Sequence, residues 1–282
     1  MQIFHKIVYI PVFCLGFILN LSALVVFIRR GRWTNMHIYM MNLLVADSAL
    51  IFFLPFRILD AYCPLKETIL CTFLLSVHYV NMYASVYTVT AISVHRFVSV
   101  KFPFKTRANR SNKSVACIVC IFIWIAIVSV CSAFNGELQP DELQTCYERR
   151  QKPLKIEFFL ILQVVGFLIP LSIIVICSIQ TICVILGSND DITEKEAKTE
   201  RKRIVAVITA NLVVFIVCFT PVHVAFLLKY IHSQDATSCN FADDHPYLHI
   251  FHEVSEWVAT TSCCLDFFGY YFLLRRVFRV QN

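Results

Sequence analysis

Charged residues are scarce in this sequence of 282 residues: Asp, Glu, Lys and Arg together make up 16%, against about 25% in an ordinary soluble domain. Hydrophobic residues reach 58%, more apolar surface than a soluble protein of this size could bury. Glycine is also scarce, with 6 residues, and the composition as a whole excludes collagen, a disordered chain and a coiled coil. The composition therefore argues against a water-soluble enzyme.

The apolar residues are gathered in seven long blocks. Each block is long enough for a helix to cross the hydrocarbon core, which takes about 20 residues. None of them alternates as a strand of a membrane β-barrel would. The first block is longer than the apolar core of a signal peptide and no small-residue cleavage site follows it, so it is interpreted as a true span. The blocks cover 7–28, 33–56, 68–95, 114–136, 158–189, 204–228 and 247–274.

The predicted fold class is therefore an all-α membrane protein, a single seven-helix transmembrane domain over 1–282. The end of the chain, 273–282, is predicted to form a short amphipathic helix on the membrane surface. With the N-terminus outside, the inner segments hold 17 of the 25 Lys and Arg, as the positive-inside rule expects. We expect a multi-pass protein of the plasma membrane. Its inner segments would be 29–35, 96–113, 187–203 and 273–282.

Most of the thirteen cysteines lie inside the apolar blocks, where cysteine behaves as a small apolar residue. Four lie on the outer side, Cys63, Cys71, Cys146 and Cys239, in a compartment that favours disulfides. A bridge between Cys71 and Cys146 could pin the second outer loop over the bundle. Cys239 would then either be free, or pair with a cysteine of a natural N-terminus longer than this one.

Two carboxylates, Asp47 and Asp266, lie near the middles of the second and seventh blocks. Buried carboxylates repel each other and lose solvation, so they need a cation or a proton between them. In the third block, Asn81 and Ser85 offer oxygen ligands that suit a small hard cation such as sodium. Two interpretations stay open: a sodium site formed by these four residues, or a hydrogen-bonded packing network that holds a proton. No other cofactor is expected.

Short motifs follow one another in a specific order along the chain. They are G-F-I-L-N at 16–20, N-L-L-V-A-D at 42–47, H-R-F at 95–97, C-F-T-P at 218–221 and D-F-F-G-Y at 266–270. Over essentially its whole length the chain resembles the rhodopsin-like (class A) G-protein-coupled receptors. The segments L-P-F-R at 54–57 and S-C-C-L-D at 262–266 resemble the branch of lysophosphatidylinositol-, lysophospholipid- and kynurenate-responsive orphan-type receptors. The resemblance implies a Cys71–Cys146 disulfide and favours the sodium site over the proton-holding network.

The chain departs from the family's pattern at positions linked to switching. The D-R-Y triplet is replaced by H-R-F at 95–97, and the Trp before the proline of span six is Phe219. The N-P-x-x-Y motif begins with Asp266 and lacks its proline, and Ser178 stands where the family commonly has Tyr in span five. These departures put the details of switching in doubt, not the fold.

A ligand site is expected in the outer half of the bundle, where polar and aromatic side chains converge. His78 stands where amine receptors have Asp, which argues against an amine ligand. Arg57 is costly inside a span unless it is paired, so it either meets Glu253 or Glu256 or contacts an anion. A lipid with an acidic head and one acyl tail fits best, and a small aromatic acid is the alternative. The expected lining comprises Arg57, His78, Tyr79, Met82, Tyr83, His223, Phe226, Lys229, His252, Glu253, Glu256 and Trp257.

The inner end is expected to contact a heterotrimeric G protein. In the family an apolar residue of the second inner loop enters the partner, and Phe104 fits that place, with a lipid-facing Phe as the alternative. Pro221 removes a helix hydrogen bond and permits a kink in span six, so an agonist could swing its inner end outward and uncover Arg96. The expected switch and G-protein residues are His95, Arg96, Phe104, Phe215, Phe219, Pro221 and Tyr270.

Neither of the family's ionic restraints on Arg96 is available in this sequence. The acid of D-R-Y is replaced by His95, and Arg201 stands where a second acid would lie at the base of span six. The adjacent Glu200 should point about 100° away around the helix. We therefore expect measurable signalling without an agonist.

Two other functional classes remain open. A decoy receptor would bind without signalling, and the atypical H-R-F at 95–97 suits it. A transporter could use the intramembrane carboxylates, but no inverted repeat or pair of broken helices is present. An enzyme is not expected, because no nucleophile–base or metal-ligand set recurs at a workable spacing. No nucleic-acid partner is expected either.

Overall fold

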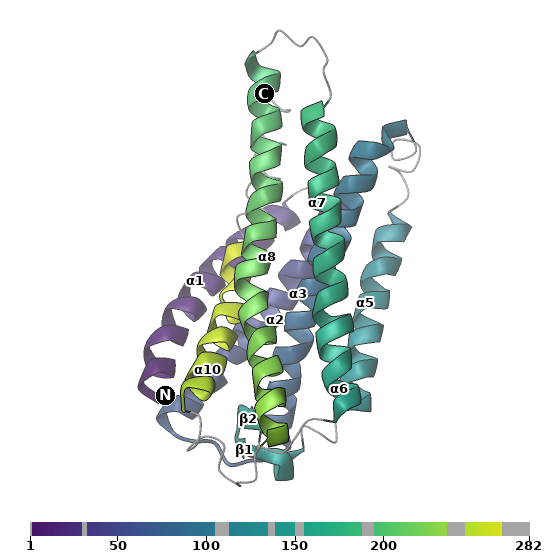
Figure 1. The fold of residues 1–282 in the computed structure, drawn as a ribbon. Helices are drawn as coiled ribbons and strands as arrows, with labels where there is room; N and C mark the ends of the chain where they lie inside the picture. The colour runs from purple at the N-terminus through teal and green to yellow at the C-terminus, as the bar shows by residue number, and fades with distance from the viewer. Residues whose placement is uncertain are drawn as a thin grey trace.

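The computed structural model describes residues 2–29, 33–104, 113–134, 139–149, 155–187, 195–235 and 246–266. Within them the chain is almost entirely helical (Figure 1). In chain order the elements are α1 (Gln2–Ile28), α2 (Asn35–Tyr62), α3 (Ile69–Lys101), α5 (Ser114–Ala133), η2 (Pro140–Glu142), β1 (Leu143–Thr145), β2 (Glu148–Arg149), α6 (Ile156–Leu160), η3 (Ile161–Leu168), α7 (Ile169–Gly187), α8 (Lys195–Asp235) and α10 (Pro246–Thr260).

Six helical stretches of the described residues are long and apolar enough to cross a membrane. One of them joins α6, η3 and α7, where η3 is a π-helical segment inside an otherwise α-helical span. The seventh block is described as far as residue 266, as α10 followed by a turn at Thr261 and further helix over 262–266. The predicted all-α seven-helix bundle is confirmed. Tyr270 and the predicted amphipathic helix over 273–282 lie outside the described residues.

Helix α8 extends well beyond its apolar block. Its 41 residues make it about 60 Å long, twice the roughly 30 Å of a hydrocarbon core. The prediction of a loop over 187–203 is therefore wrong for residues 195–203, which are helical. Lys, Arg and Glu in this segment are strong helix formers, and their side chains need water but not a loop. Figure 1 shows α8 and α7 projecting beyond the other helices at one end.

The side chains are distributed as the membrane requires. Large apolar residues on the outside of the bundle are exposed, among them Phe52 at 71% and Phe122 at 69%. In water such surfaces would cause aggregation, whereas lipid tails accept them. The largest buried cluster lies between α3, α7 and α8 and includes Met82, Phe215 and Phe219.

Buried polar side chains join the helices to one another. Asn42 on α2 donates to Oγ1 of Thr88 on α3 at 2.7 Å, and Trp124 on α5 donates to Oδ1 of Asn42 at 2.8 Å. On the other side of the bundle, Nδ2 of Asn20 donates to the carbonyl of Cys263 at 3.0 Å. Such hydrogen bonds hold helices together in lipid, where apolar burial gives little preference for one helix neighbour over another.

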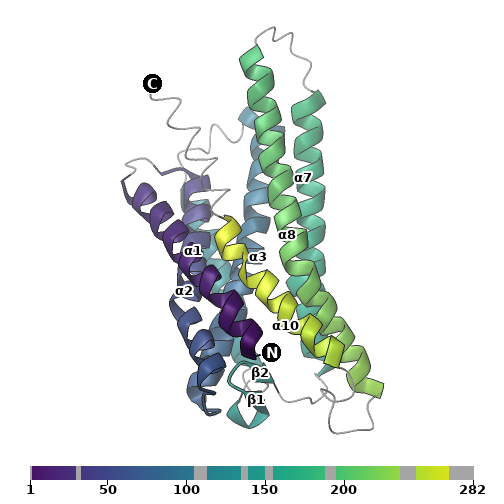
Figure 2. The ribbon, with the colours of Figure 1, turned by 90° about the vertical axis from the view of Figure 1, so that its left-hand side faces the viewer.

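The two ends of the bundle differ. The beginning of α1 and the antiparallel β1–β2 hairpin lie at one end, which we call the hairpin end (Figures 1 and 2). Helix α3 begins at this end with Ile69 and finishes with Lys101 at the opposite end, which we call the far end. The hairpin end and the far end each carry one group of predicted functional residues.

Candidate functional site

A disulfide fixes the hairpin to the bundle. Cys71, in the first turn of α3, is bonded to Cys146, which lies in the turn between β1 and β2. Both cysteines are buried with Leu74, Leu75 and Leu143 in a small separate core. The predicted disulfide is confirmed. It also fixes the position of the next residue in the chain, Tyr147, whose pKa is raised by burial, so the phenol is neutral and presents an apolar ring to its neighbours.

Arg57 is the centre of an ion-pair cluster at the hairpin end. Its Nη2 lies 2.7 Å from Oε2 of Glu256 and 3.6 Å from Oε2 of Glu253, and its side chain is only 4% exposed. The guanidinium carbon lies 4.8 Å from the ring centre of Tyr9 and 5.2 Å from that of Tyr147. Arg57 therefore contacts two carboxylates of α10 and two aromatic rings, one from α1 and one from the hairpin. Of the two alternatives for Arg57, the structure contains the ion pair.

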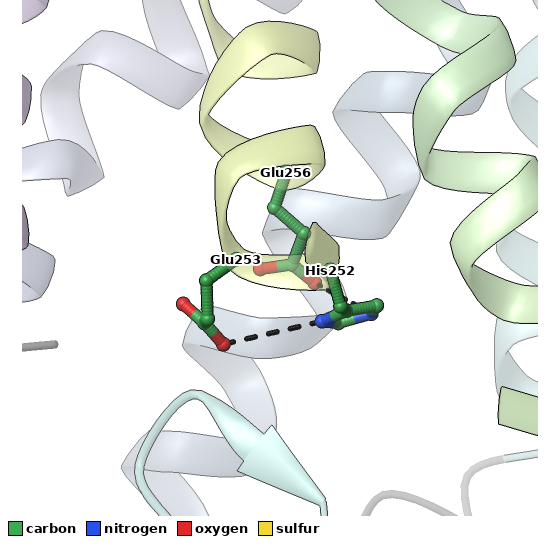
Figure 3. A group of neighbouring side chains, drawn as sticks. All are labelled: His252, Glu253 and Glu256. Carbon is green, nitrogen blue, oxygen red and sulfur yellow. Dashed lines mark ion pairs between the residues drawn. The ribbon is translucent and has the colours of Figure 1, made fainter. Parts of the chain in front are cut away.

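Two histidines flank the carboxylates. His5 places Nε2 at 2.7 Å from Oε2 of Glu253. His252 lies between the two carboxylates, with Nδ1 at 3.9 Å from Oε1 of Glu253 and Nε2 at 3.7 Å from Oε1 of Glu256 (Figure 3). His252, Glu253 and Glu256 come from consecutive turns of α10, and His5 comes from α1. Besides the two imidazoles, the cluster holds two carboxylates and one guanidinium.

Part of the donor capacity of Arg57 is unused. Among the described residues, its Nε and Nη1 have no hydrogen-bond partner although both atoms are buried. A guanidinium carries five N–H donors in a planar fork, and a buried donor left unpaired costs about 1–3 kcal/mol. An oxyanion that accepts from one of these two donors would remove part of this cost. The ion pair with Glu256 thus does not exclude contact with an anion.

Aromatic side chains form the wall beside this cluster. The ring centres of Phe226 and His252 are 5.4 Å apart, and those of Tyr79 and Phe226 are 6.3 Å apart. Tyr83 stacks on His223 at 6.0 Å. Met82 and His78 are buried on the same helix as Tyr79 and Tyr83. Lys229 is half-buried on α8, three residues after Phe226 and so on a neighbouring part of the helix surface.

The π-helical segment shapes this wall from the side of span five. A Cβ at Gly166 would lie 2.6 Å from Cε1 of Tyr83, so only glycine lets the Tyr83 ring pack here. Gln163 donates to the carbonyl of His223 at 2.8 Å, and Tyr87 donates to the carbonyl of Val165 at 2.7 Å. These contacts tie span five to α3 and α8. π-Helical segments are frequent at functional sites, because they turn side chains away from the α-helical register.

The predicted sodium ligands lie in the middle of the bundle. Asp47 and Ser85 are buried, and Oγ of Ser85 has no hydrogen-bond partner among the described residues. Nδ2 of Asn81 donates to the carbonyl of Ala46, the residue before Asp47. Asp266 is half-buried in the helical stretch 262–266. A buried hydroxyl without a partner can serve as a ligand for a small hard cation, and the sodium site stays a prediction.

At the far end, Arg96 contacts an amide and not a carboxylate. The Asn211 side chain, turned so that its oxygen faces the guanidinium, accepts from Nη1 at 2.9 Å and from Nη2 at 3.2 Å. A small cleft beside Arg96 is lined in part by Ser178, Thr181 and Asn211. The ring of His95 contacts Tyr39 instead, at 5.8 Å between centres.

Other predicted switch residues occupy contrasting positions. Phe215 and Phe219 are buried on α8 with ring centres 5.1 Å apart, and Pro221 lies in the same helix. Phe104 is 86% exposed. Oε2 of Glu200 lies 3.8 Å from Nη1 of Arg203, one turn further along α8. The role of these residues in coupling stays a prediction.

Sequence reasoning missed four residues at these sites. His5 and Tyr9 lie one turn apart on α1, and both contact the Arg57 cluster or its carboxylates. Tyr147 follows Cys146 directly, so the predicted disulfide was itself a signal for it. Asn211 was visible as an isolated amide inside the sixth apolar block.

The fold and the two sites define a multi-pass membrane receptor with one cluster of charged and aromatic residues at each end. The family model described as 7 transmembrane receptor (rhodopsin family) matches residues 19–270, and the chain belongs to this family. More narrowly, it is a G-protein-coupled receptor of the lysophospholipid and orphan branch. The family is not enzymatic.

Individual relatives cover almost the whole chain. It is 30% identical over 278 residues to G-protein coupled receptor 55 of Homo sapiens, covering 95% of this chain and 84% of the relative. It is 34% identical over 282 residues to Lysophosphatidic acid receptor 4 of Homo sapiens, covering 95% of this chain and 73% of the relative. It is 33% identical over 264 residues to G-protein coupled receptor 35 of Homo sapiens, covering 93% of this chain and 81% of the relative.

Proposed function

We propose that this receptor binds a lysophospholipid or a small anionic metabolite at the hairpin end and activates a heterotrimeric G protein at the far end. The hairpin end would face the outside of the plasma membrane. Both the 17 of 25 Lys and Arg in the predicted inner segments and the Cys71–Cys146 disulfide support this orientation, since disulfides persist in oxidising compartments.

The anionic character of the ligand rests on the unused donors of Arg57. Nε and Nη1 are buried without partners, while Nη2 is held by Glu256. A phosphate or carboxylate oxygen would accept from Nε–H or from Nη1–H without breaking the ion pair. Charge-assisted hydrogen bonds of this kind contribute about 1.5–3 kcal/mol each.

The apolar part of the ligand would lie against the aromatic wall. Tyr79, Met82, Tyr83 and Phe226 offer apolar side chains to an acyl chain, with His78, His223 and Lys229 as further polar groups. One relative bears the name Lysophosphatidic acid receptor 4, which supports a lysophospholipid for this chain as well. A small aromatic acid would use the same Arg57 edge and a shorter part of the wall.

The signalling role rests on the far end. Arg96, the cleft beside it and the exposed Phe104 form the surface that the G protein would contact. A sodium ion held by Asp47, Asn81, Ser85 and Asp266 would favour the inactive packing. A decoy receptor is the second candidate, because His95 cannot pair with Arg96 as an acid would.

The test compares agonist-evoked nucleotide exchange on a G protein for matched variants at equal surface expression. The probes are oleoyl lysophosphatidic acid, lysophosphatidylinositol and kynurenate. Replacing Arg57 alone would leave two buried carboxylates unpaired and could unfold the protein. The double variant Arg57→Met with Glu256→Gln therefore removes the donors together with one carboxylate, and Glu256→Gln alone is the control that keeps the donors.

We expect the double variant to lose at least about tenfold in potency for the active probe, as the loss of charge-assisted hydrogen bonds implies, and the control to stay responsive. Equal potency in the two variants would exclude the anion-binding role of Arg57. Specific binding of a probe without any exchange, on any class of G protein, would favour the decoy receptor.

A further inference from the structure

Three side chains at the hairpin end are close enough to hold a metal ion together, and a fourth lies beside them. His252, Glu253 and Glu256 each offer one ligand atom, and these atoms all lie within 4.8 Å of one another (Figure 3). His5 adds a second imidazole, with Nε2 at 2.7 Å from Oε2 of Glu253. Two imidazoles with two carboxylates are a mixed nitrogen and oxygen set. Such a set suits Zn²⁺ and similar transition metals, whereas Ca²⁺ and Mg²⁺ prefer oxygen alone.

The spacing of these atoms fits a tetrahedral ion. Ligands about 2.0–2.1 Å from a central Zn²⁺ lie about 3.3 Å from one another. The pairs here are 2.7 Å for His5 and Glu253, 3.7 Å for His252 and Glu256, and 3.9 Å for His252 and Glu253. Because His252 is measured once from Nδ1 and once from Nε2, binding requires side-chain rotations that bring one atom of each residue to that distance.

The charge of the cluster also calls for a cation. Glu253 and Glu256 face a single guanidinium, and a buried negative charge that stays uncompensated is costly. The two carboxylate oxygens of Glu256 have different partners: Arg57 binds Oε2, while Oε1 faces His252. A carboxylate can bind a metal through one oxygen while a second residue holds the other oxygen and so fixes its orientation.

An unsatisfied nitrogen points to a ligand. Nδ1 of His252 has no hydrogen-bond partner among the described residues, and the side chain is 8% exposed. Oε1 of Glu253 faces this nitrogen at 3.9 Å, too far for a hydrogen bond, so the nitrogen remains available to bind an ion. His5 is 19% exposed, so the cluster is open to an ion on the side of α1.

We propose that His5, His252, Glu253 and Glu256 form a binding site for a divalent transition-metal ion of the Zn²⁺ class. The ion joins the beginning of α1 to α10, two helices that lie next to each other and are already linked by the hydrogen bond from Trp257 to the carbonyl of Val8 (Figure 2). The site does not depend on the identity of the agonist.

The test is metal binding to the purified full chain in lipid nanodiscs, without agonist or G protein. Thermal unfolding is followed by tryptophan fluorescence after removal of metals with a chelator, and then with added Zn²⁺ or Mg²⁺. We expect Zn²⁺ at a hundredfold excess over its Kd to raise Tm by about 5–10 °C, and Mg²⁺ to have little effect. His5→Ala and His252→Ala should each weaken Zn²⁺ binding at least about tenfold. His249→Ala, which removes another imidazole from α10, is the matched control and should bind as the wild type does.

Co²⁺ gives a second measurement that needs no variant. A tetrahedral site of imidazoles and carboxylates gives ligand-field absorption in the visible range without thiolate charge-transfer bands. The proposal is overturned if Zn²⁺ leaves the wild-type Tm unchanged, if Mg²⁺ stabilises equally, or if both histidine variants keep full affinity. Thiolate bands would place the ion on free cysteines such as Cys63 and would also overturn it. A negative result here leaves the agonist test of Arg57 unaffected.

Discussion

The guanidinium of Arg96 donates to the side-chain oxygen of Asn211 at 2.9 and 3.2 Å, so its partner on α8 is a neutral amide. Within the described part of the chain, Arg96 has no ion pair with a carboxylate. A hydrogen bond to a neutral acceptor is weaker than one to a carboxylate by about half. This hydrogen bond therefore links α3 to α8 at the far end but restrains their separation only weakly.

Basal signalling should fall when an acid is restored beside Arg96. We expect His95→Asp to lower agonist-free nucleotide exchange several-fold, since a partly buried charge pair is worth on the order of 1–3 kcal/mol. His95→Asn is the control, because it has the shape of Asp without the charge. The measurement is basal exchange at matched surface expression. A silent wild type, or an Asp variant no quieter than the Asn variant, would refute the argument.

Asn211 offers an independent way to change the same restraint. Asn211→Asp should convert the neutral contact with Arg96 into an ion pair and lower basal exchange. Asn211→Leu has a similar volume but no acceptor, and should raise basal exchange above the wild type. The same exchange assay measures both. A rise in Asn211→Asp, a fall in Asn211→Leu, or no change in either would mean that this contact does not restrain the far end.

Loss of the disulfide should affect both stability and the ligand site. Cys71 and Cys146 are separated by 75 residues in sequence, so the chain-entropy model gives roughly 4 kcal/mol for their bond. We expect Cys146→Ala to lower Tm and to weaken the response to an anionic agonist, because Tyr147 would no longer be held against Arg57. Cys63→Ala removes an exposed free cysteine and should behave as the wild type does. An intact response in a folded Cys146→Ala protein would show that the hairpin does not contribute to the ligand site.

Gly166 should not tolerate a methyl group. In Gly166→Ala the new Cβ would lie 2.6 Å from the Tyr83 ring, and overpacking of this kind costs about 1–3 kcal/mol. We expect a Tm lower by roughly 3–10 °C in a thermal unfolding scan. The matched control is Gly187→Ala, where the described part of the chain places no atom within 4 Å of the added Cβ apart from neighbouring backbone, and Tm should stay the same or rise slightly. Equal Tm values for the two variants would contradict the packing argument.

Sodium should stabilise the receptor if the central carboxylates hold it. We expect NaCl to raise Tm by a few °C relative to choline chloride at equal ionic strength, as about 1 kcal/mol of ligand linkage would. The Na⁺ effect should disappear in Asp47→Asn, which keeps the size of the side chain but removes the charge. Ser48→Ala, one residue along and exposed, should retain the effect. Identical Tm values in both salts for the wild type would favour the proton-holding network instead.

The sequence by itself determined the spanning helices and several single residues. Lipid offers no partner to backbone N–H and C=O groups, so long apolar blocks have to be helical wherever they cross. Lipid also does not solvate charged side chains, so a charge inside a span needs a partner. For this reason the sequence alone indicated that Arg57 and Asp47 have a special role. Cys71 and Cys146 were paired through the family resemblance, and the structure contains that bond.

Only the tertiary structure decided which partners these residues have. Glu256 meets Arg57 across 199 residues of sequence, and Trp257 meets Val8 across 249. Such contacts depend on which helices are neighbours and how each is rotated about its axis, and apolar blocks without a strong periodic pattern do not specify that rotation. The length of α8 and the π-helical turn around Gly166 escaped prediction for a related reason. The water-exposed end of α8 is helical because of the helix propensity of its residues. The close approach of Tyr83 to Gly166 depends on packing between helices. A hydropathy profile contains neither kind of information.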